Sequence, residues 1–200
     1  MKNKNIQLLT QAGLIAAIYV VLCIIFAPIG SGEVQVRIAE MLTILPFFTP
    51  AAVPGLFIGC LLANTLTGAV LPDIIFGSLA TLVAAIITSR IGKSWREARQ
   101  AANQSAPATG AASFEATAPA NQGARTALNV PFGKLILATI PPILANALVV
   151  PFVLKYAYGV PLPIPVMMLT VGAGEVIGCG ALGFFLGRLI LRYRGRIRFS

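Results

Sequence analysis

Long runs of apolar residues, separated by short polar or proline-containing breaks, dominate this sequence of 200 residues. A sixth apolar segment, at about 34–48, is shorter than the other five, contains Arg37 and Glu40, and ends between two prolines. The pattern predicts an all-α integral membrane protein in which this segment is either a sixth, polar-lined span or a re-entrant piece. The five longer runs could each cross a hydrocarbon core of about 30 Å, and they lie at about 8–28, 51–71, 73–89, 131–154 and 163–190.

Basic residues beside the apolar runs predict the topology. One group lies at 90–99, after the run at 73–89, and another lies at 188–198. Two spans separate the groups, which places both on one side of the membrane, and the positive-inside rule assigns that side to the cytoplasm. If the segment at 34–48 also crosses, the amino terminus falls on this side as well. We therefore expect a bundle of six transmembrane helices with both termini in the cytoplasm.

The composition supports a membrane location. Hydrophobic residues make up 57% of the chain and charged residues 10%, and the mean hydropathy is +0.86, which together exclude an ordinary soluble domain. Topology explains the net charge of +9, because the basic residues gather beside apolar spans and form no face for nucleic acid. Residues 100–130 are small and polar. Within a single membrane domain over 1–200, they predict a flexible cytoplasmic linker, because they cannot offset their ordering entropy.

The residue types argue against catalysis and against bound metal. The sequence has no histidine, and Cys23, Cys60 and Cys179 each lie alone in an apolar stretch, without the spacing of a zinc or thiol-redox site. Residues 92–94 resemble the end of a phosphate-binding loop, but position 87 is isoleucine where the loop requires glycine. We expect no enzymatic activity, no metal and no cofactor in this chain.

Arg37 and Glu40 are the most informative residues, because an ionisable side chain at the bilayer centre costs about 2.5 to 3.5 kcal/mol. Residues three apart share a face of a helix, so the two side chains either neutralise each other or bracket one polar ligand. Asn64, Asn146 and Glu175 lie in other predicted helices, and Glu175 is near the middle of the last span. We expect these five residues to converge on one substrate-binding pocket.

Two other features have structural interpretations. Asp73 follows Pro72 at the start of a predicted helix, where a carboxylate caps free amide groups and interacts with the helix dipole. Small residues four apart, such as Ala12 and Ala16, allow close helix contact, within the chain more often than with a partner. The same spacing occurs at Gly13 and Ala17, Gly55 and Gly59, Gly174 and Gly178, and Gly183 and Gly187.

Intramembrane carboxylates without a nucleotide site leave two main hypotheses. The first is a self-sufficient carrier of a small polar metabolite, driven by an ion gradient. The second is a binding subunit that separate proteins energise, and a structural or assembly protein is a third idea. A chain of this size with no visible inverted repeat is small for an alternating-access carrier unless it dimerises, so the second hypothesis is favoured.

Several stretches are similar to one known family, the queuosine-precursor transporter family, QueT. The first family motif usually has the order Arg-Ile-Ser-Glu-Ala, so Ala39 and Met41 depart from it, although the charged pair is intact. The resemblance is absent from the predicted linker. The stretches that carry it are 34–46 (VQVRIAEMLTILP), 51–64 (AAVPGLFIGCLLAN), 73–81 (DIIFGSLAT) and 174–179 (GEVIGC).

This resemblance implies a function. Members of the family resemble the substrate-binding, or S, components of energy-coupling factor (ECF) transporters, which work with a transmembrane T component and two ABC-type ATPases that use the ATP. The implied fold has six helices with cytoplasmic termini in the cell membrane, and Ala12 and Ala16 would contact the T component.

The implied ligand is a queuosine precursor of the 7-deazaguanine class, bound toward the outer face. Its ring N–H and amino groups would donate to Glu175 or Glu40, and its carbonyl would accept from Arg37 or Asn64. The implied activity is binding without catalysis.

Overall fold

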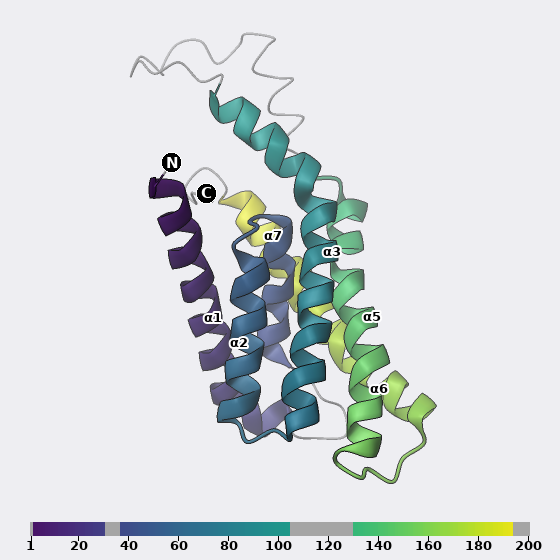
Figure 1. Cartoon of the computed structure of the whole chain (residues 1–200). Helices are drawn as coiled ribbons and strands as arrows, with labels where there is room; N and C mark the ends of the chain where they lie inside the picture. Colours follow the sequence, from purple (N-terminus) through teal and green to yellow (C-terminus); the bar gives the residue numbers. More distant parts are fainter. Residues whose placement is uncertain (1, 31–36, 105–129, 194–200) are drawn as a thin grey trace.

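The computed structural model describes residues 2–30, 37–104 and 130–193, and within these ranges the fold contains helices and no strands (Figure 1). The 3₁₀-helix η1 and the π-helical segment η2 are the two departures from α-helix, and η2 joins α6 and α7 into one continuous rod. The all-α prediction is confirmed for the described residues. In chain order the elements are α1 (Lys2–Gly30), η1 (Ile38–Phe47), α2 (Ala52–Leu66), α3 (Leu71–Gln104), α5 (Phe132–Tyr156), α6 (Ile164–Glu175), η2 (Val176–Leu182) and α7 (Gly183–Arg192).

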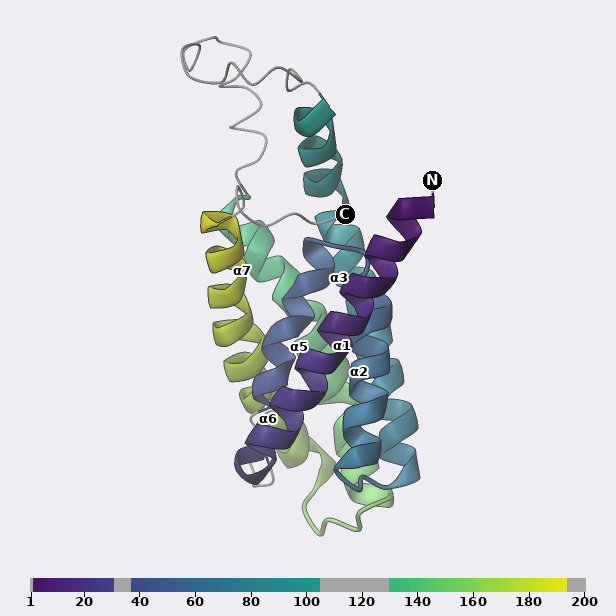
Figure 2. The same ribbon diagram turned by 90° about the vertical axis from the view of Figure 1, so that its left-hand side faces the viewer.

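Successive helices run in alternating directions along one bundle (Figures 1 and 2). The start of α1, the ends of α3 and α7 and the start of α5 lie at one end, which places Arg188, Arg192 and the basic group at 90–99 together there. The α2–α3 turn and the α5–α6 loop lie at the opposite end. The helix arrangement therefore agrees with the expectation that both basic groups share one side. Arg194, Arg196 and Arg198 lie outside the described residues.

Within the described ranges, four helical rods are long and apolar enough to cross a membrane. η1 and α2 are shorter than these rods. The 10 residues of 3₁₀-helix in η1 cover about 20 Å, and the 15 residues of α-helix in α2 cover about 22 Å. The run expected at 51–71 is interrupted because α2 ends in a turn at Gly68, whose φ of 75° suits glycine. The fold is therefore that of a multi-pass membrane protein. The four long rods are Asn5–Ala27, Leu71–Ala101, Phe132–Tyr156 and Ile164–Arg192.

α3 is longer than the span expected at 73–89, because it continues through the basic group to Gln104. Within this extension Lys93 and Glu97, one turn apart, form an exposed ion pair of 3.8 Å, which adds a small stabilisation to the helix. The expected linker therefore begins later than predicted, since 100–104 are still helical. Its remainder, 105–129, lies outside the described residues.

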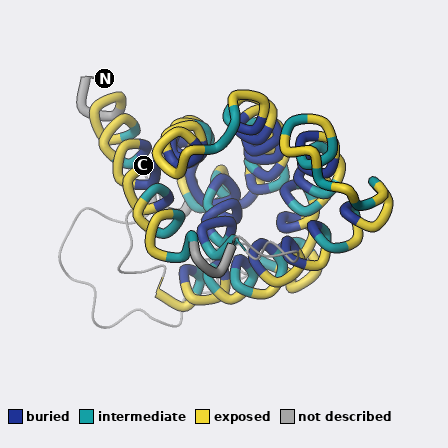
Figure 3. The backbone as a smooth tube through the Cα atoms, turned by 90° about the horizontal axis from the view of Figure 1, so that it is seen from below, coloured by how far each residue is buried: buried dark blue, intermediate teal, exposed yellow. Residues whose placement is uncertain are grey.

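η1 occupies the interior of the bundle, where it contacts α1, α2, α3, α5, η2 and α7. Figure 3 shows that buried positions face the inside of the bundle and exposed positions face outward. Large apolar side chains such as Leu9, Leu169 and Phe185 are exposed on the outside, as expected for surfaces that meet lipid. Every described residue of η1 is at least half-hidden from solvent, and Ile44 and Phe47 are fully buried.

The small residues predicted to allow close contact pack α1 against α2. A Cβ added at Gly55 would lie 2.8 Å from the backbone oxygen of Ala12, and one at Gly59 would lie 3.1 Å from Cα of Ala16. Ala12 and Ala16 are each only 6% exposed. In this structure α2 covers both alanines, and their contact with a partner protein stays a prediction.

Candidate functional site

A cavity of about 400 Å³ lies at the end of the bundle that holds the α2–α3 turn and the α5–α6 loop. Its walls come from the last turns of α1, the start of η1, the α2–α3 turn, the last turns of α5 and the loop after it. A mixture of apolar walls and a few placed polar groups is typical of small-molecule sites. The polar side chains that line it are those of Arg37, Asn64, Thr67, Asp73 and Tyr158.

Asp73 connects the polar side chains of this cavity. Its Oδ2 accepts a hydrogen bond of 3.0 Å from the Tyr158 hydroxyl and lies 4.0 Å from Nη2 of Arg37. The side-chain amide of Asn64 donates to the backbone oxygen of Asp73 at 3.4 Å. Asp73 is only 6% exposed, and among the described residues no hydrogen-bond donor reaches its Oδ1 atom.

Tyr158 follows α5 and donates across the cavity to the start of α3. Its hydroxyl also accepts a hydrogen bond of 3.3 Å from the backbone N–H of Val70 in the α2–α3 turn. Partial burial, together with the neighbouring Asp73 carboxylate, raises the pKa of the Tyr158 hydroxyl above its ordinary value. The hydroxyl therefore stays protonated at neutral pH and can donate to Asp73.

The cap interpretation of Asp73 needs correction. The residue does lie in the first turn of α3, where its charge suits the helix dipole. However, its recorded side-chain hydrogen bond comes from Tyr158, and no backbone amide of the described residues donates to the carboxylate. Asp73 is therefore part of the cavity chemistry as well as of the helix start.

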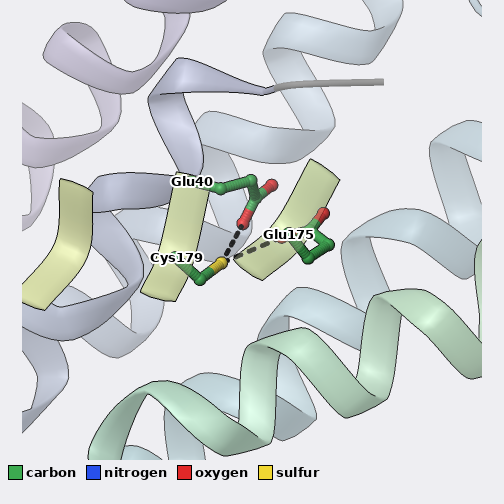
Figure 4. A group of neighbouring side chains, drawn as sticks. All are labelled: Glu40, Glu175 and Cys179. Atoms are coloured by element: carbon green, nitrogen blue, oxygen red, sulfur yellow. Dashed lines mark hydrogen bonds between the residues drawn. The ribbon is translucent and has the colours of Figure 1, made fainter. Parts of the chain in front are cut away.

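A second polar cluster, consisting of Glu40, Glu175, Cys179, Tyr19 and Asn146, lies buried between η1, α1, α5 and the last rod. Figure 4 shows three of its side chains, those of Glu40, Glu175 and Cys179. The Tyr19 hydroxyl donates to Oε1 of Glu40 at 2.6 Å, and Nδ2 of Asn146 donates to Oε1 of Glu175 at 2.9 Å. The Cys179 thiol lies between the two carboxylates, 2.9 Å from Oε2 of Glu175 and 4.0 Å from Oε2 of Glu40. Each carboxylate thus has a donor from a different helix.

The π-helical segment places Cys179 in this cluster. Glu175 is the last residue of α6, and η2 begins directly after it. The rod approaches the start of η1 so closely that a Cβ at Gly178 would lie 2.8 Å from the backbone oxygen of Arg37. π-Bulges occur frequently at functional sites. Here the bulge and the glycine bring the thiol of η2 against the first turn of η1.

The ligating atoms of Glu40, Glu175 and Cys179 lie within 4.8 Å of one another. Two carboxylates and a thiol at this distance can share a proton or ligate a small cation. Glu40 and Glu175 are 1% and 3% exposed, so water does not replace the internal donors. The cluster is a closed hydrogen-bonded network, in contrast to the open cavity.

The five residues expected to form one pocket fall into two groups. Arg37 and Asn64 line the cavity, whereas Glu40, Asn146 and Glu175 belong to the buried cluster. Arg37 and Glu40 do not neutralise each other through an ion pair, since Arg37 faces Asp73 and Glu40 accepts from Tyr19. The reason is local: Arg37 precedes η1 with extended φ and ψ of −88° and 98°, so the shared-face rule of a helix does not apply to it.

Sequence reasoning missed several members of both groups. Tyr19 and Cys179 were not assigned a polar role, and their partners lie far away in sequence or on another helix. The sequence pattern indicates a helix cap for Asp73, and Tyr158 is not among the expected site residues. One signal in the sequence could have identified Asp73 as a site residue. It follows a predicted turn at the outer end of the bundle, and polar residues of other predicted helices lie at the same end.

Four apolar rods long enough to cross a bilayer and a polar cavity between them define a multi-pass membrane protein with a small-molecule site. The sequence profile of the QueT transporter family matches residues 9–192, and the chain belongs to that family. The resemblance found in the motifs is therefore confirmed. The proteins of this family are described as transporters, not enzymes.

A curated relative agrees with the family. The queuosine precursor transporter QueT of Lactococcus lactis subsp. cremoris (strain MG1363) is 36% identical over 84 residues. The aligned region covers 41% of this chain and 48% of that relative, so the chain matches about half of the relative's length. No solved structure matches the chain significantly.

Proposed function

We propose that this chain is the membrane-embedded substrate-binding subunit of an ECF-type uptake transporter for a queuosine precursor of the 7-deazaguanine class. The observation that carries the proposal is the cavity, which presents Arg37, Asn64 and Asp73 at the end of the bundle opposite the start of α1 and the end of α7. The name of the relative supports the substrate class.

The orientation follows from charge. The end that carries the basic residues of 90–99, Arg188 and Arg192 is the cytoplasmic end by the positive-inside rule. The cavity then opens toward the outside of the cell, where an uptake protein must capture its ligand. This orientation also places both termini in the cytoplasm, as the sequence predicts.

The residues at the cavity and the residues of the buried cluster have different roles in binding. Arg37 and Asn64 lie at the cavity and donate to the carbonyl of the base. Glu40, Asn146 and Glu175 do not line the cavity but lie in the buried cluster, where Glu40 is fixed by Tyr19. In this arrangement the deeper carboxylates contribute electrostatic attraction for the donor groups of the ligand, in addition to their internal contacts.

Energy must come from partner proteins in this proposal. The sequence has no complete phosphate-binding loop, so the chain would not use ATP itself. A T component and two ABC-type ATPases would supply ATP hydrolysis and move the loaded subunit. The rival hypothesis, an ion-gradient-driven carrier, needs neither ATP nor partners.

Calorimetry and vesicle uptake together test the proposal. The purified, folded chain is expected to bind a 7-deazaguanine, and uptake into vesicles is expected only with co-reconstituted partners and ATP. Uptake by the chain alone that an uncoupler abolishes would favour the carrier. A folded chain that binds no 7-deazaguanine, with or without partners, would contradict the proposal.

A further inference from the structure

Asp73 is the buried acidic side chain that the structure places on the cavity wall. It is 6% exposed, it lines the cavity, and its Oδ1 has no hydrogen-bond donor among the described residues. A buried carboxylate oxygen without a donor lowers the stability of the fold, because it has lost its hydrogen bonds to water and no protein donor replaces them. A ligand N–H group completes this oxygen once a rotation of the carboxylate turns it toward the cavity that Asp73 lines.

The neighbours of Asp73 leave it available for such a ligand. Nη2 of Arg37 lies 4.0 Å from Oδ2, which is beyond hydrogen-bond distance, so the guanidinium does not saturate the carboxylate. Tyr158 donates one hydrogen bond to Oδ2, and a carboxylate has about four acceptor positions. Arg37 and Asp73 therefore present a donor and an acceptor side by side on one wall.

A guanine-like edge matches this pair of side chains. It carries a carbonyl oxygen, then a ring N–H, then an exocyclic amino group, in the order acceptor, donor, donor. A carboxylate can accept from both donors at once, and an arginine beside it can donate to the carbonyl. Hypoxanthine-like edges lack the amino donor and fill only one of the two acceptor positions.

We propose that Asp73 binds the substrate directly and accepts its ring N–H and exocyclic amino group, with Arg37 on the adjacent carbonyl. Tyr158 is a positioning residue, because its hydroxyl holds Oδ2 at the cavity wall. This inference rests on the proposed function, and it assigns to Asp73 the role that sequence reasoning gave to Glu40 or Glu175.

Calorimetry with two ligands tests the inference on the detergent-solubilised full chain. The probes are a 7-deazaguanine and the matching 7-deazahypoxanthine, which lacks the amino group. Wild-type protein is expected to prefer the former by about 10- to 100-fold, the range for one hydrogen bond to a charged group. In Asp73→Asn, binding of the 7-deazaguanine weakens by about the same factor or more, and the preference for the amino group disappears.

Matched variants separate binding from folding. Glu97→Gln makes the same carboxylate-to-amide change on an exposed part of α3 and is expected to leave both affinities unchanged. If Asp73→Asn does not fold, Gly77→Ala replaces it, because the added Cβ would lie 3.2 Å from Oδ1 of Asp73 and 3.3 Å from Nδ2 of Asn64. That crowding is expected to weaken the 7-deazaguanine more than its amino-free analogue.

The outcomes distinguish this inference from the proposed function. Wild-type protein that binds neither ligand contradicts the proposed function itself. Wild-type protein that binds the 7-deazaguanine, together with a folded Asp73→Asn variant that keeps the same affinity and the same preference, overturns the role of Asp73 alone. Loss of the preference in Asp73→Asn or Gly77→Ala, with Glu97→Gln unchanged, supports it.

Discussion

The two ends of η1 are built in opposite ways. At the Phe47 end, aromatic rings pack closely, and Arg96 donates to the backbone oxygens of Pro46 and Phe47 at 2.9 and 3.0 Å. At the Arg37 end, a cavity separates the helices, and an arginine and an aspartate face each other at 4.0 Å. The first end is complete without a ligand, whereas the second has polar groups that a ligand would complete.

This difference explains how one short helix serves both stability and binding. Six elements surround η1, so its Phe47 end can be fixed while its Arg37 end remains open. Changes at the Phe47 end should lower stability, and changes at the Arg37 end should lower affinity. Variants at the two ends of η1 separate these two effects.

The largest effect is expected from Gly92→Ala. A Cβ at this position would overlap the backbone oxygen of Phe47, and neither backbone can move aside without separating α3 from η1. We expect a loss of about 3 kcal/mol or more of stability, measured by thermal unfolding in detergent. Gly133→Ala is the matched control, because an added Cβ there meets nothing within 4 Å. Equal stability of the two variants would contradict close packing at this end.

Arg96→Met should have the next largest effect on stability. The change leaves the backbone oxygens of Pro46 and Phe47 without their side-chain donor, at a cost of about 2 kcal/mol. Thermal unfolding measures the loss, and ligand affinity of the folded fraction should stay near wild type. The exposed Arg90 supplies the control, since Arg90→Met removes the same charge from the same helix without breaking a recorded bond. A destabilisation shared by both variants would indicate a charge effect.

At the Arg37 end of η1, Arg37→Met should lower ligand affinity more than stability. The side chain is 24% exposed and its partner is 4.0 Å away, so its loss should cost less than about 1 kcal/mol of stability. Affinity for a 7-deazaguanine should fall by about 10- to 100-fold, because the carbonyl loses its donor. Calorimetry and thermal unfolding on the same preparation decide the matter. Unfolding without a change in affinity would make Arg37 a structural residue.

The smallest effect is expected from Tyr158→Phe, which removes one partly exposed hydrogen bond worth about 1 kcal/mol or less. The raised pKa of Tyr158 gives the effect a pH dependence. The unfolded hydroxyl ionises first, near pH 10, so the contribution of the native hydroxyl is present below that pH and is lost as pH rises through the native pKa. Stability measured from pH 8 to 11 should fall more steeply for wild type than for Tyr158→Phe. Parallel curves would contradict the Tyr158–Asp73 bond.

The sequence predicts the helices well because bilayer-spanning runs are a property of local composition. It does not predict that α3 reaches Gln104, because that extension depends on Trp95 and Arg96 packing against η1. It does not predict the shape of η1 either, since a 3₁₀-helix that contains Pro46 arises from the space between neighbouring helices. These features depend on packing between residues that are far apart in the sequence, which a local sequence pattern does not contain.

The candidate site shows the same limit. Arg37 and Asn64 both line the cavity at one end of the bundle, and position along a helix is enough to indicate such a depth. The separation of Arg37 from Glu40 is not predictable, since it depends on one extended residue before η1 and on a tyrosine from α1. Charged residues that are close in sequence can therefore belong to different sites.

Ligand protection of an introduced cysteine tests most directly whether substrate occupies the cavity. Thr67 lines the cavity, whereas the nearby Thr65 is exposed but does not line it, so Thr67→Cys and Thr65→Cys form a matched pair. A water-soluble maleimide would label each variant in membranes, with mass spectrometry locating the label. A saturating 7-deazaguanine is expected to slow labelling at position 67 and leave position 65 unchanged. Ligand binding by calorimetry without protection at position 67 would contradict a binding site in this cavity.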